Sequence, residues 1–387
     1  MTYAVKNRVL LTLVVLLIAA GSGLAFLSHA PNRLISGQGI SLFSLLHGFA
    51  LLLVIPVFFL LLLSFISPSR RSHLLVLLMA EILLAGLVGL SGHTALVLTG
   101  GDEDSLARTS FGSGFWSCAA LALLIASDAI SRLTRSHSWR ILLNVQIAVP
   151  VILLLASGQL SQLSLLKEYD NRSDVFNAAL WQHLGILLGT LLPAILIGVP
   201  LGLICTNSAR WKAVILPLLN IIQTIPSIAL FGLLLAPLAG LAKALPWLSA
   251  IGISGIGVAP AIIALVLYSL LPLVRSVIAG LGSVPENVLE SARGMGMSRS
   301  QVFFKAQIPI ALPVILSGIR IVAVQTVGMA MVAALIGAGG LGAIMFQGLL
   351  SSALDLVLLG VIPAILMAVI VDGLFKFLVS ILETSRK

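Results

Sequence analysis

Charged side chains are scarce in this chain of 387 residues. They make up 9% of it, whereas a soluble globular domain carries about 25%. Hydrophobic residues reach 59%, and the mean hydropathy is +1.16. So little charge among so many apolar residues excludes an ordinary soluble domain. The composition therefore indicates an all-α integral membrane protein, because helices satisfy their own backbone hydrogen bonds within lipid.

Cysteine is also rare, and the chain lacks several signatures of chemistry. Cys118 and Cys205 both fall in apolar runs, so we expect two packing residues and no disulfide framework. The six histidines form no pair four residues apart and have no cysteine partner, so no metal site is predicted. A serine nucleophile elbow is missing as well. These absences argue against an enzyme.

No nucleotide site can be found in the sequence either. The dipeptide Gly-Lys does not occur, which excludes the P-loop pattern and ATP hydrolysis by that route. Gly337, Gly339 and Gly342 match the spacing of the dinucleotide fingerprint, but they follow a membrane span instead of a soluble strand. We therefore interpret these glycines as a tight turn against the outer mouth of the bundle and predict no cofactor.

Long apolar runs are what the chain does have. A helix needs roughly 20 apolar residues to cross about 30 Å of hydrocarbon. Ten runs approach that length, at residues 9–28, 45–66, 74–92, 111–130, 141–157, 184–205, 213–236, 258–280, 312–336 and 356–379. We therefore predict about ten transmembrane helices.

The basic residues predict the orientation of these spans. If Lys6 and Arg8 are cytoplasmic, most of the 22 basic residues fall on the cytoplasmic side, as the positive-inside rule requires. An even number of spans then places both termini in the cytoplasm. The net charge of +9 is explained by this topology, and no nucleic-acid partner is predicted.

A break in the apolar pattern near residues 160–180 divides the chain. We predict an N-terminal membrane extension of about five spans at 1–175 and a second unit of about five spans at 176–387. The segment from Val175 is compatible with either an amphipathic helix at the outer interface or a plain extension of the sixth span. Within that span, glycines four residues apart predict close helix packing; they are Gly185 with Gly189, and Gly198 with Gly202.

A polar island at residues 282–309 interrupts the second unit. Ser283 with Glu286, and Ser298 with Gln301, have the spacing of capping boxes, which start helices. We expect two short helices joined at a turn at Gly294–Met297. Such a helix-turn-helix outside the membrane is suited to being held by another protein.

Uncharged polar residues inside two spans form a candidate path for a solute. They can hydrate a solute without the cost of a buried ion, and a proline frees backbone carbonyls; they are Gln223, Thr224, Pro226 and Ser227 in the seventh span, and Gln325 and Thr326 in the ninth. Hydrogen bonding between helices is the alternative. Glu81 lies inside the third span without a charged neighbour, so it is either paired across helices, protonated, or part of a polar path.

The polar island resembles the EAA loop of ABC importer permeases. That pattern is Glu-Ala-Ala, three residues, Gly, nine residues and Ile-x-Leu-Pro. Here it stands as Glu290-Ser291-Ala292, Gly296 and then Ala306-Gln307-Ile308-Pro309, with conservative departures at Ser291, Ala306 and Ile308. In the family this loop docks on the cytoplasmic ATPase, so the resemblance implies that Glu290, Ser291, Ala292, Gly296 and Pro309 couple this chain to ATP hydrolysis on another subunit.

The resemblance covers roughly residues 176–380 and implies a type I ABC importer permease core. QTIPSIALFGLL from Gln223 and IGAGGLG from Ile336 are similar to the glycine betaine, carnitine and choline branch, and more narrowly to an osmoprotectant permease of enteric bacteria with a long N-terminal extension. It implies a multi-pass protein surrounded by lipid in a bacterial inner membrane. The implied partners are a cytoplasmic ABC ATPase dimer, a second permease subunit and a periplasmic solute-binding protein.

Two other functions stay open at this stage. The coupling loop is shared across substrates, so a permease for methionine or another small amino acid is an alternative. An ion-coupled secondary transporter is a second one, for which Glu81 is the expected coupling site, although no convincing inverted repeat relates the two halves.

Overall fold

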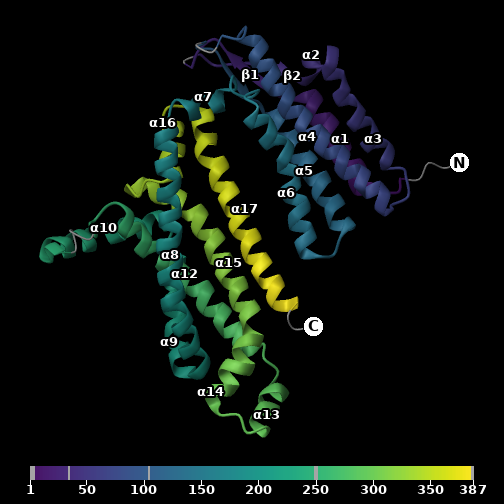
Figure 1. The fold of residues 1–387 in the computed structure, drawn as a ribbon. Coiled ribbons are helices and arrows are strands. Elements are labelled where there is room, and N and C mark those ends of the chain that lie inside the picture. Colours follow the sequence, from purple (N-terminus) through teal and green to yellow (C-terminus); the bar gives the residue numbers. More distant parts are fainter. Residues whose placement is uncertain (1–4, 34, 103–104, 248–251, 385–387) are drawn as a thin grey trace. The chain divides into compact units, whose positions relative to one another are not determined.

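A computed structural model describes residues 5–33, 35–102, 105–247 and 252–384, so the two chain ends lie outside the described residues. The chain divides into two units, Met1–Asn171 and Arg172–Lys387. Figure 1 shows the elements of each unit. Each has its own buried apolar core, in which most side chains come from long helices.

The first unit is built from helices and three short strands. They are α1 (Arg8–Gly23), β1 (Ala25–Ala30), β2 (Gln38–Ser41), α2 (Leu42–Leu45), the 3-10 helix η1 (Gly48–Leu53), α3 (Val54–Leu63), α4 (Arg70–Leu98), β3 (Arg108–Phe111), α5 (Ser113–Leu133), α6 (His137–Ala156) and α7 (Ser164–Asp170). The core of this unit is apolar, and Phe26, Leu60, Leu83 and Ile125 are almost fully buried.

The strands form a small antiparallel sheet, which the sequence analysis did not predict. Its order is β2-β1-β3, and Ser28 pairs with Gly39 on one side and Ser110 on the other. The first predicted span, 9–28, therefore ended too late, because the helix stops at Gly23 and the chain continues into β1.

A polar cluster lies beside β3 in the first unit. Glu168 of α7 is buried, with its Oε1 3.6 Å from Arg33 and 3.8 Å from Arg108. The Nζ of Lys167 donates to the carbonyl of Ser105 at 3.0 Å. Burial lowers the pKa of the Lys167 ammonium below its usual range, and the Arg108 guanidinium lowers it further, while Asp102 acts in the opposite direction. The cluster ties α7 to the loop before β3.

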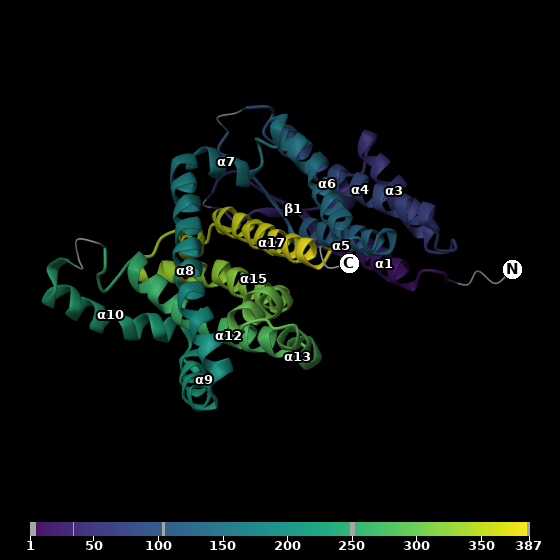
Figure 2. The ribbon, with the colours of Figure 1, turned by 60° about the horizontal axis from the view of Figure 1, so that its bottom comes forward.

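The second unit is a helical bundle (Figure 2). Its elements are α8 (Ser173–Asn207), α9 (Ala209–Thr224), α10 (Ser227–Ala244), α12 (Val258–Gly282), α13 (Glu286–Gly294), α14 (Arg299–Gln301), the π-helix η2 (Val302–Gln307), α15 (Ile308–Ala333), the 3-10 helix η3 (Ala334–Ile336), α16 (Leu341–Leu350) and α17 (Leu354–Thr384). The segment from Val175 was compatible with an amphipathic interfacial helix or with an extension of the sixth span. It is an extension of the sixth span, because α8 runs unbroken for 35 residues.

Glycines on α8 allow α12 to pack closely, as predicted. A Cβ on Gly198 would lie 2.8 Å from Leu273, and one on Gly202 would lie 2.5 Å from Val277. Gly189 has the same relation to α12, whereas a Cβ on Gly185 would meet nothing within 4 Å. Three of the four spaced glycines are thus packing positions.

Nine of the ten predicted spans each correspond to one apolar helix of the structure. Among the described residues, eight helices are long and apolar enough to cross a membrane. The predicted spans 9–28 and 45–66 correspond to the shorter apolar helices Arg8–Gly23 and Gly48–Leu63. The predicted span 213–236 is interrupted at Ile225 and Pro226, which separate α9 from α10. Proline cannot donate a backbone hydrogen bond and holds the preceding residue extended.

The glycine-rich segment after α15 forms the tight turn that we expected. Gly337, Gly339 and Gly340 have φ values of +81°, +71° and +70°, which favour glycine. The Gln182 side chain of α8 donates to the carbonyl of Ala338 at 2.9 Å and accepts from the amide of Gly340 at 3.2 Å. The turn is therefore fastened to α8.

Candidate functional site

The polar island contains one of the two predicted capping boxes. The Ser298 hydroxyl accepts from the amide of Gln301 at 3.3 Å, and the Gln301 side chain accepts from the amide of Ser298 at 2.8 Å. The box predicted at Ser283 and Glu286 is wrong, because Ser283 ends α12 and its hydroxyl donates to the carbonyl of Gly280. Pro285 precedes α13 instead and makes no side-chain cap.

The turn between α13 and α14 depends on Gly296. This residue has a φ of +78°. Its amide donates to the carbonyl of Arg293 at 2.9 Å, and the amide of Met297 donates to the carbonyl of Ala292 at 3.2 Å. These two bonds form a Schellman motif, which ends a helix and satisfies its last carbonyls. The glycine of the EAA pattern is therefore the residue that reverses the chain.

The loop packs on the bundle through one face and exposes the other. Leu289, Ala292 and Val302 are buried in a cluster that includes residues of α12 and α15. Glu290 and Ser291 lie on the exposed side of α13. The buried face fixes the position of the exposed residues relative to the bundle.

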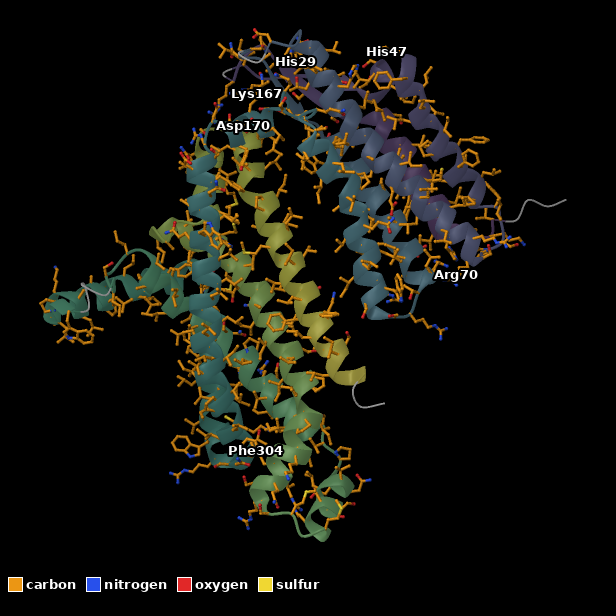
Figure 3. The ribbon with its side chains drawn as sticks, viewed as in Figure 1. His29, His47, Arg70, Lys167, Asp170 and Phe304 are labelled. Carbon is orange, nitrogen blue, oxygen red and sulfur yellow. The ribbon has the colours of Figure 1, made fainter. Side chains whose placement is uncertain are left out.

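Two large apolar side chains on this loop are exposed. Met295 is 71% exposed and Phe304, labelled in Figure 3, is 66% exposed. Neither residue was predicted as part of the site, although two large apolar residues within a polar island are a signal that the sequence contains. They add exposed apolar surface to the loop that carries Glu290, which suits contact with another protein.

A π-helical turn connects this loop to α15. It spans Val302–Gln307, and Pro309 follows in the first turn of α15, where it is exposed. Pro309 has no amide hydrogen to donate to the carbonyl of Lys305. The wider turn just before it leads the chain from the loop into the bundle.

A cavity of about 480 Å³ lies between α9, α10, α12 and α15. It is lined by five of the six residues predicted for a solute path, namely Gln223, Thr224, Pro226, Ser227 and Gln325. The structure thus brings together residues about 100 positions apart in the sequence. The other lining residues are Ile225, Tyr268, Pro272 and Met329, and none of the nine carries a charge.

The break between α9 and α10 is held by Tyr268 of α12. The Gln223 side chain donates to the backbone carbonyl of Tyr268 at 3.0 Å, and the Tyr268 hydroxyl donates to the carbonyl of Ile225. Pro226 accepts the first backbone hydrogen bond of α10, from Leu230, at 2.9 Å. Tyr268 was not predicted, because only the fold brings it to the break.

Thr326 does not line this cavity. It is 1% exposed, and its hydroxyl donates to the carbonyl of Val322 at 2.8 Å within the same helix. Its neighbour Gln325 is exposed, and its amide contacts the sulfur of Met329 at 3.4 Å. One helical position therefore separates a cavity residue from a packing residue.

Glu81 pairs across helices in the first unit. Its Oε2 accepts from the side chain of Gln146 on α6 at 3.4 Å. This contact agrees with the first of the three possibilities raised by the sequence, while the buried Oε1 of Glu81 has no hydrogen-bond partner among the described residues. Within the part of the chain that the structure describes, no group of three or more His, Cys, Asp or Glu side chains could hold a metal ion.

Comparison with known proteins matches both units to families. Residues 198–384 match the family described as binding-protein-dependent transport system inner membrane component. Residues 6–166 match the N-terminal domain of the ABC transporter permease YehY. The chain is 38% identical over 192 residues to the carnitine transport permease protein OpuCB of Listeria monocytogenes, covering 50% of this chain and 81% of the relative.

Two further relatives give the same result. The chain is 41% identical over 195 residues to the osmoprotectant import permease protein OsmW of Salmonella typhimurium, covering 50% of this chain and 85% of that protein. It is 35% identical over 192 residues to the choline transport system permease protein OpuBB of Bacillus subtilis, covering 50% and 81%. The chain belongs to the family of binding-protein-dependent transport system inner membrane components. It is a permease subunit of an ABC importer and a multi-pass protein of the inner membrane.

Proposed function

We propose that this permease imports a small osmoprotectant such as glycine betaine, which it receives from a periplasmic binding protein. The observation that carries the proposal is the identity of 35–41% to permeases named for carnitine, osmoprotectants and choline. Carnitine and choline share a trimethylammonium group with glycine betaine. A solute of that class is the cargo that these relatives support.

The cavity at the α9–α10 break suits the passage of such a solute. Amide and hydroxyl groups of Gln223, Thr224, Ser227 and Gln325 can replace water around it. A fixed charge would hold a zwitterion too firmly to release it, and the nine lining residues carry none. We infer that Pro226 keeps this path open and that Thr326 supports it from within α15.

In this proposal, the coupling loop at 282–309 transmits the ATP-driven conformational change of the ATPase to the permease. A cytoplasmic ABC ATPase dimer would dock on the exposed residues Glu290, Ser291, Gly296 and Pro309, while the buried Ala292 would hold α13 on the bundle. Met295 and Phe304 extend the exposed surface available to it. The absence of Gly-Lys supports ATP hydrolysis on that partner. A second permease chain, identical or related, would complete the pathway. The distribution of the basic residues favours a cytoplasmic position for both termini and for this loop.

Uptake into proteoliposomes tests the function. The full chain is reconstituted with its ATPase and binding protein, and uptake of radiolabelled glycine betaine is measured with and without enclosed ATP. We expect ATP-dependent uptake that excess methionine does not reduce. An ionophore should leave it unchanged. Competition by methionine at equal strength contradicts the osmoprotectant assignment, and loss of uptake with the ionophore contradicts ATP coupling.

Substitution of Glu290 tests the coupling assignment separately. Glu290→Lys reverses a charge on the exposed side of α13 without touching the buried cluster. We expect it to abolish uptake while insertion into the membrane is unchanged, and Glu290→Gln to have a smaller effect. Normal ATP-dependent uptake by Glu290→Lys would remove Glu290 from the coupling site.

A further inference from the structure

A second cavity lies in the first unit, and none of its lining residues belongs to the proposed transport path. Its volume is about 510 Å³. It is a groove between η1, α4 and the residues that follow α6, and its lining includes Phe49, Leu53, Gly86, His93 and Gln159. The function proposed above uses none of these residues.

The groove follows the axis of α4. Its lining residues on that helix extend from Ile82 to Leu96, which is about 21 Å at 1.5 Å per residue. One leaflet of hydrocarbon is about 15 Å thick, half of the bilayer core. Gly89 contributes no side chain to this face of α4, so the helix backbone forms part of the floor there, whereas the Leu53 side chain packs directly against Gly86. The lining residues of the groove therefore extend along the span.

Its polarity differs from one end to the other. The lining is apolar except for His93 and Gln159, and His93 lies in the last two turns of α4. The His93 ring packs edge-on against Phe49, with ring centroids 4.9 Å apart. A Cβ on the adjacent Gly92 would lie 2.6 Å from the carbonyl oxygen of Gln159, so the two polar segments approach closely. The polar groups thus gather at the end of the span.

The rim of the groove is exposed and apolar. Leu52 is 63% exposed, Ile82 46% and Leu96 44%. Exposed apolar side chains along a span suit contact with hydrocarbon, so an occupant can enter from the membrane. Its matching chemistry is a long apolar chain that ends in a polar group at the membrane surface.

We propose that this groove binds one phospholipid of the surrounding bilayer. One acyl chain lies along α4 over Gly89 and beside Leu53, and the ester and headgroup region lies at His93 and Gln159. The side-chain amide of Gln159 and the imidazole N–H of His93 can donate hydrogen bonds to ester and phosphate oxygens. This assigns a lipid-binding role to the first unit and does not depend on which solute the second unit transports.

Photolabelling of the full chain tests the site. The protein is reconstituted with phosphatidylethanolamine that carries a diazirine in the middle of one acyl chain, and labelled residues are mapped by mass spectrometry. We expect label on 49–53 and 82–96 in clear excess over Leu74, Leu75 and Leu78, which are 48–49% exposed on α4 outside the groove. Equal labelling of both stretches would mean ordinary surrounding lipid and would overturn the proposal.

A matched pair of variants sharpens this test. The Cβ of a residue at position 89 would meet only Leu154, at 3.9 Å, so Gly89→Leu adds a side chain to the groove with little strain. If the new side chain displaces about two methylene groups of the acyl chain from contact with the groove, the occupancy of the groove by lipid falls about tenfold. Gly23→Leu adds the same side chain where a Cβ meets nothing within 4 Å, outside the groove. We expect reduced groove labelling only for Gly89→Leu, and an equal loss in both variants contradicts the site.

A photo-crosslinking residue in place of Leu52 distinguishes the other possible occupant. We expect this rim position to capture lipid. Capture of a segment of protein in its place would identify the groove as a helix-docking surface and overturn the lipid assignment.

Discussion

Gly296 shows how one residue determines the geometry of the proposed coupling loop at 282–309. Its φ of +78° lies where a side chain is strained, although a Cβ there would meet nothing within 4 Å. A side chain at this position would therefore destabilise the turn because its backbone disfavours a positive φ, and not because it would clash with a neighbour. Two hydrogen bonds of the Schellman motif, at Gly296 and Met297, depend on that conformation.

We predict that Gly296→Ala weakens the turn by about 1 kcal/mol, which corresponds to roughly fivefold faster amide exchange at Gly296 and Met297. ATP-dependent uptake should fall with it, because the exposed face of α13 loses its fixed position. Hydrogen exchange measured by mass spectrometry on the peptide covering 286–307 checks the first effect. Gly294→Ala is the matched control, since Gly294 ends the helix without a positive φ; equal damage from both variants contradicts the argument.

Lys167 makes stability depend on pH. Its folded-state pKa is lowered, by burial first and by Arg108 second, so folding disfavours the charged form. Burial of the charged ammonium therefore lowers the free energy of unfolding by its full amount at pH values below the folded-state pKa. This loss of stability decreases as the pH rises towards the pKa of the unfolded state, which is about 10.4. The melting temperature of the wild type minus that of Lys167→Met, measured in detergent, should therefore increase with alkaline pH up to that value. A constant or falling difference would show that Lys167 is not the cause.

The α9–α10 break is the feature that creates the proposed path at the scale of an element. Pro226 removes one backbone donor, and Ile225 before it is extended with ψ 127°. Tyr268 and Gln223 stabilise this conformation by hydrogen bonds between α12 and the broken segment. The cavity therefore depends on a discontinuity in the helix as much as on its lining side chains.

We predict that Pro226→Ala lowers ATP-dependent uptake about tenfold or more. Alanine restores the amide donor and is the best helix former, so α9 can continue towards α10 and close the break. Pro217→Ala, at a proline inside α9, is the control and should leave uptake near normal. A cysteine placed at Thr224 should react with a soluble thiol reagent in the parent and lose that reactivity with Pro226→Ala. Retained reactivity together with full uptake would show that the path does not need the break.

Local signals in the sequence predicted most of the helices. The elements that were missed, such as the strands of the small sheet, depend on contacts between residues far apart in the sequence. Apolar runs located the spans because the bilayer selects them by length and composition. The capping box predicted at Ser298 was correct. The one predicted at Ser283 was wrong, because α12 continues through Gly282 and Ser283 is its C-terminal cap. The strand pairing of His29 with Thr109 joins residues 80 positions apart and has no local signature.

The candidate site divides in the same way. The coupling loop is contiguous, so its spacing from Glu290 to Pro309 could be read directly from the sequence. Gln223 and Gln325 were selected one by one as polar residues in spans, and the packing of α9, α10, α12 and α15 then placed them around one cavity. Tyr268 could not be found in this way, because nothing in its own segment indicates that it faces a break in another helix.

Two units with separate buried cores also imply separate folding at the scale of the whole molecule. The core that includes Leu60 and Leu87 lies within 1–171, and the cores of the bundle lie within 172–387. Half of this chain covers 81% and 85% of two relatives. We therefore predict that a chain of residues 172–387 alone inserts, binds its ATPase and supports ATP-dependent uptake at a rate comparable to that of the full chain. Insertion without uptake would show that the first unit takes part in transport, and failure to insert would show that the second unit depends on it for folding.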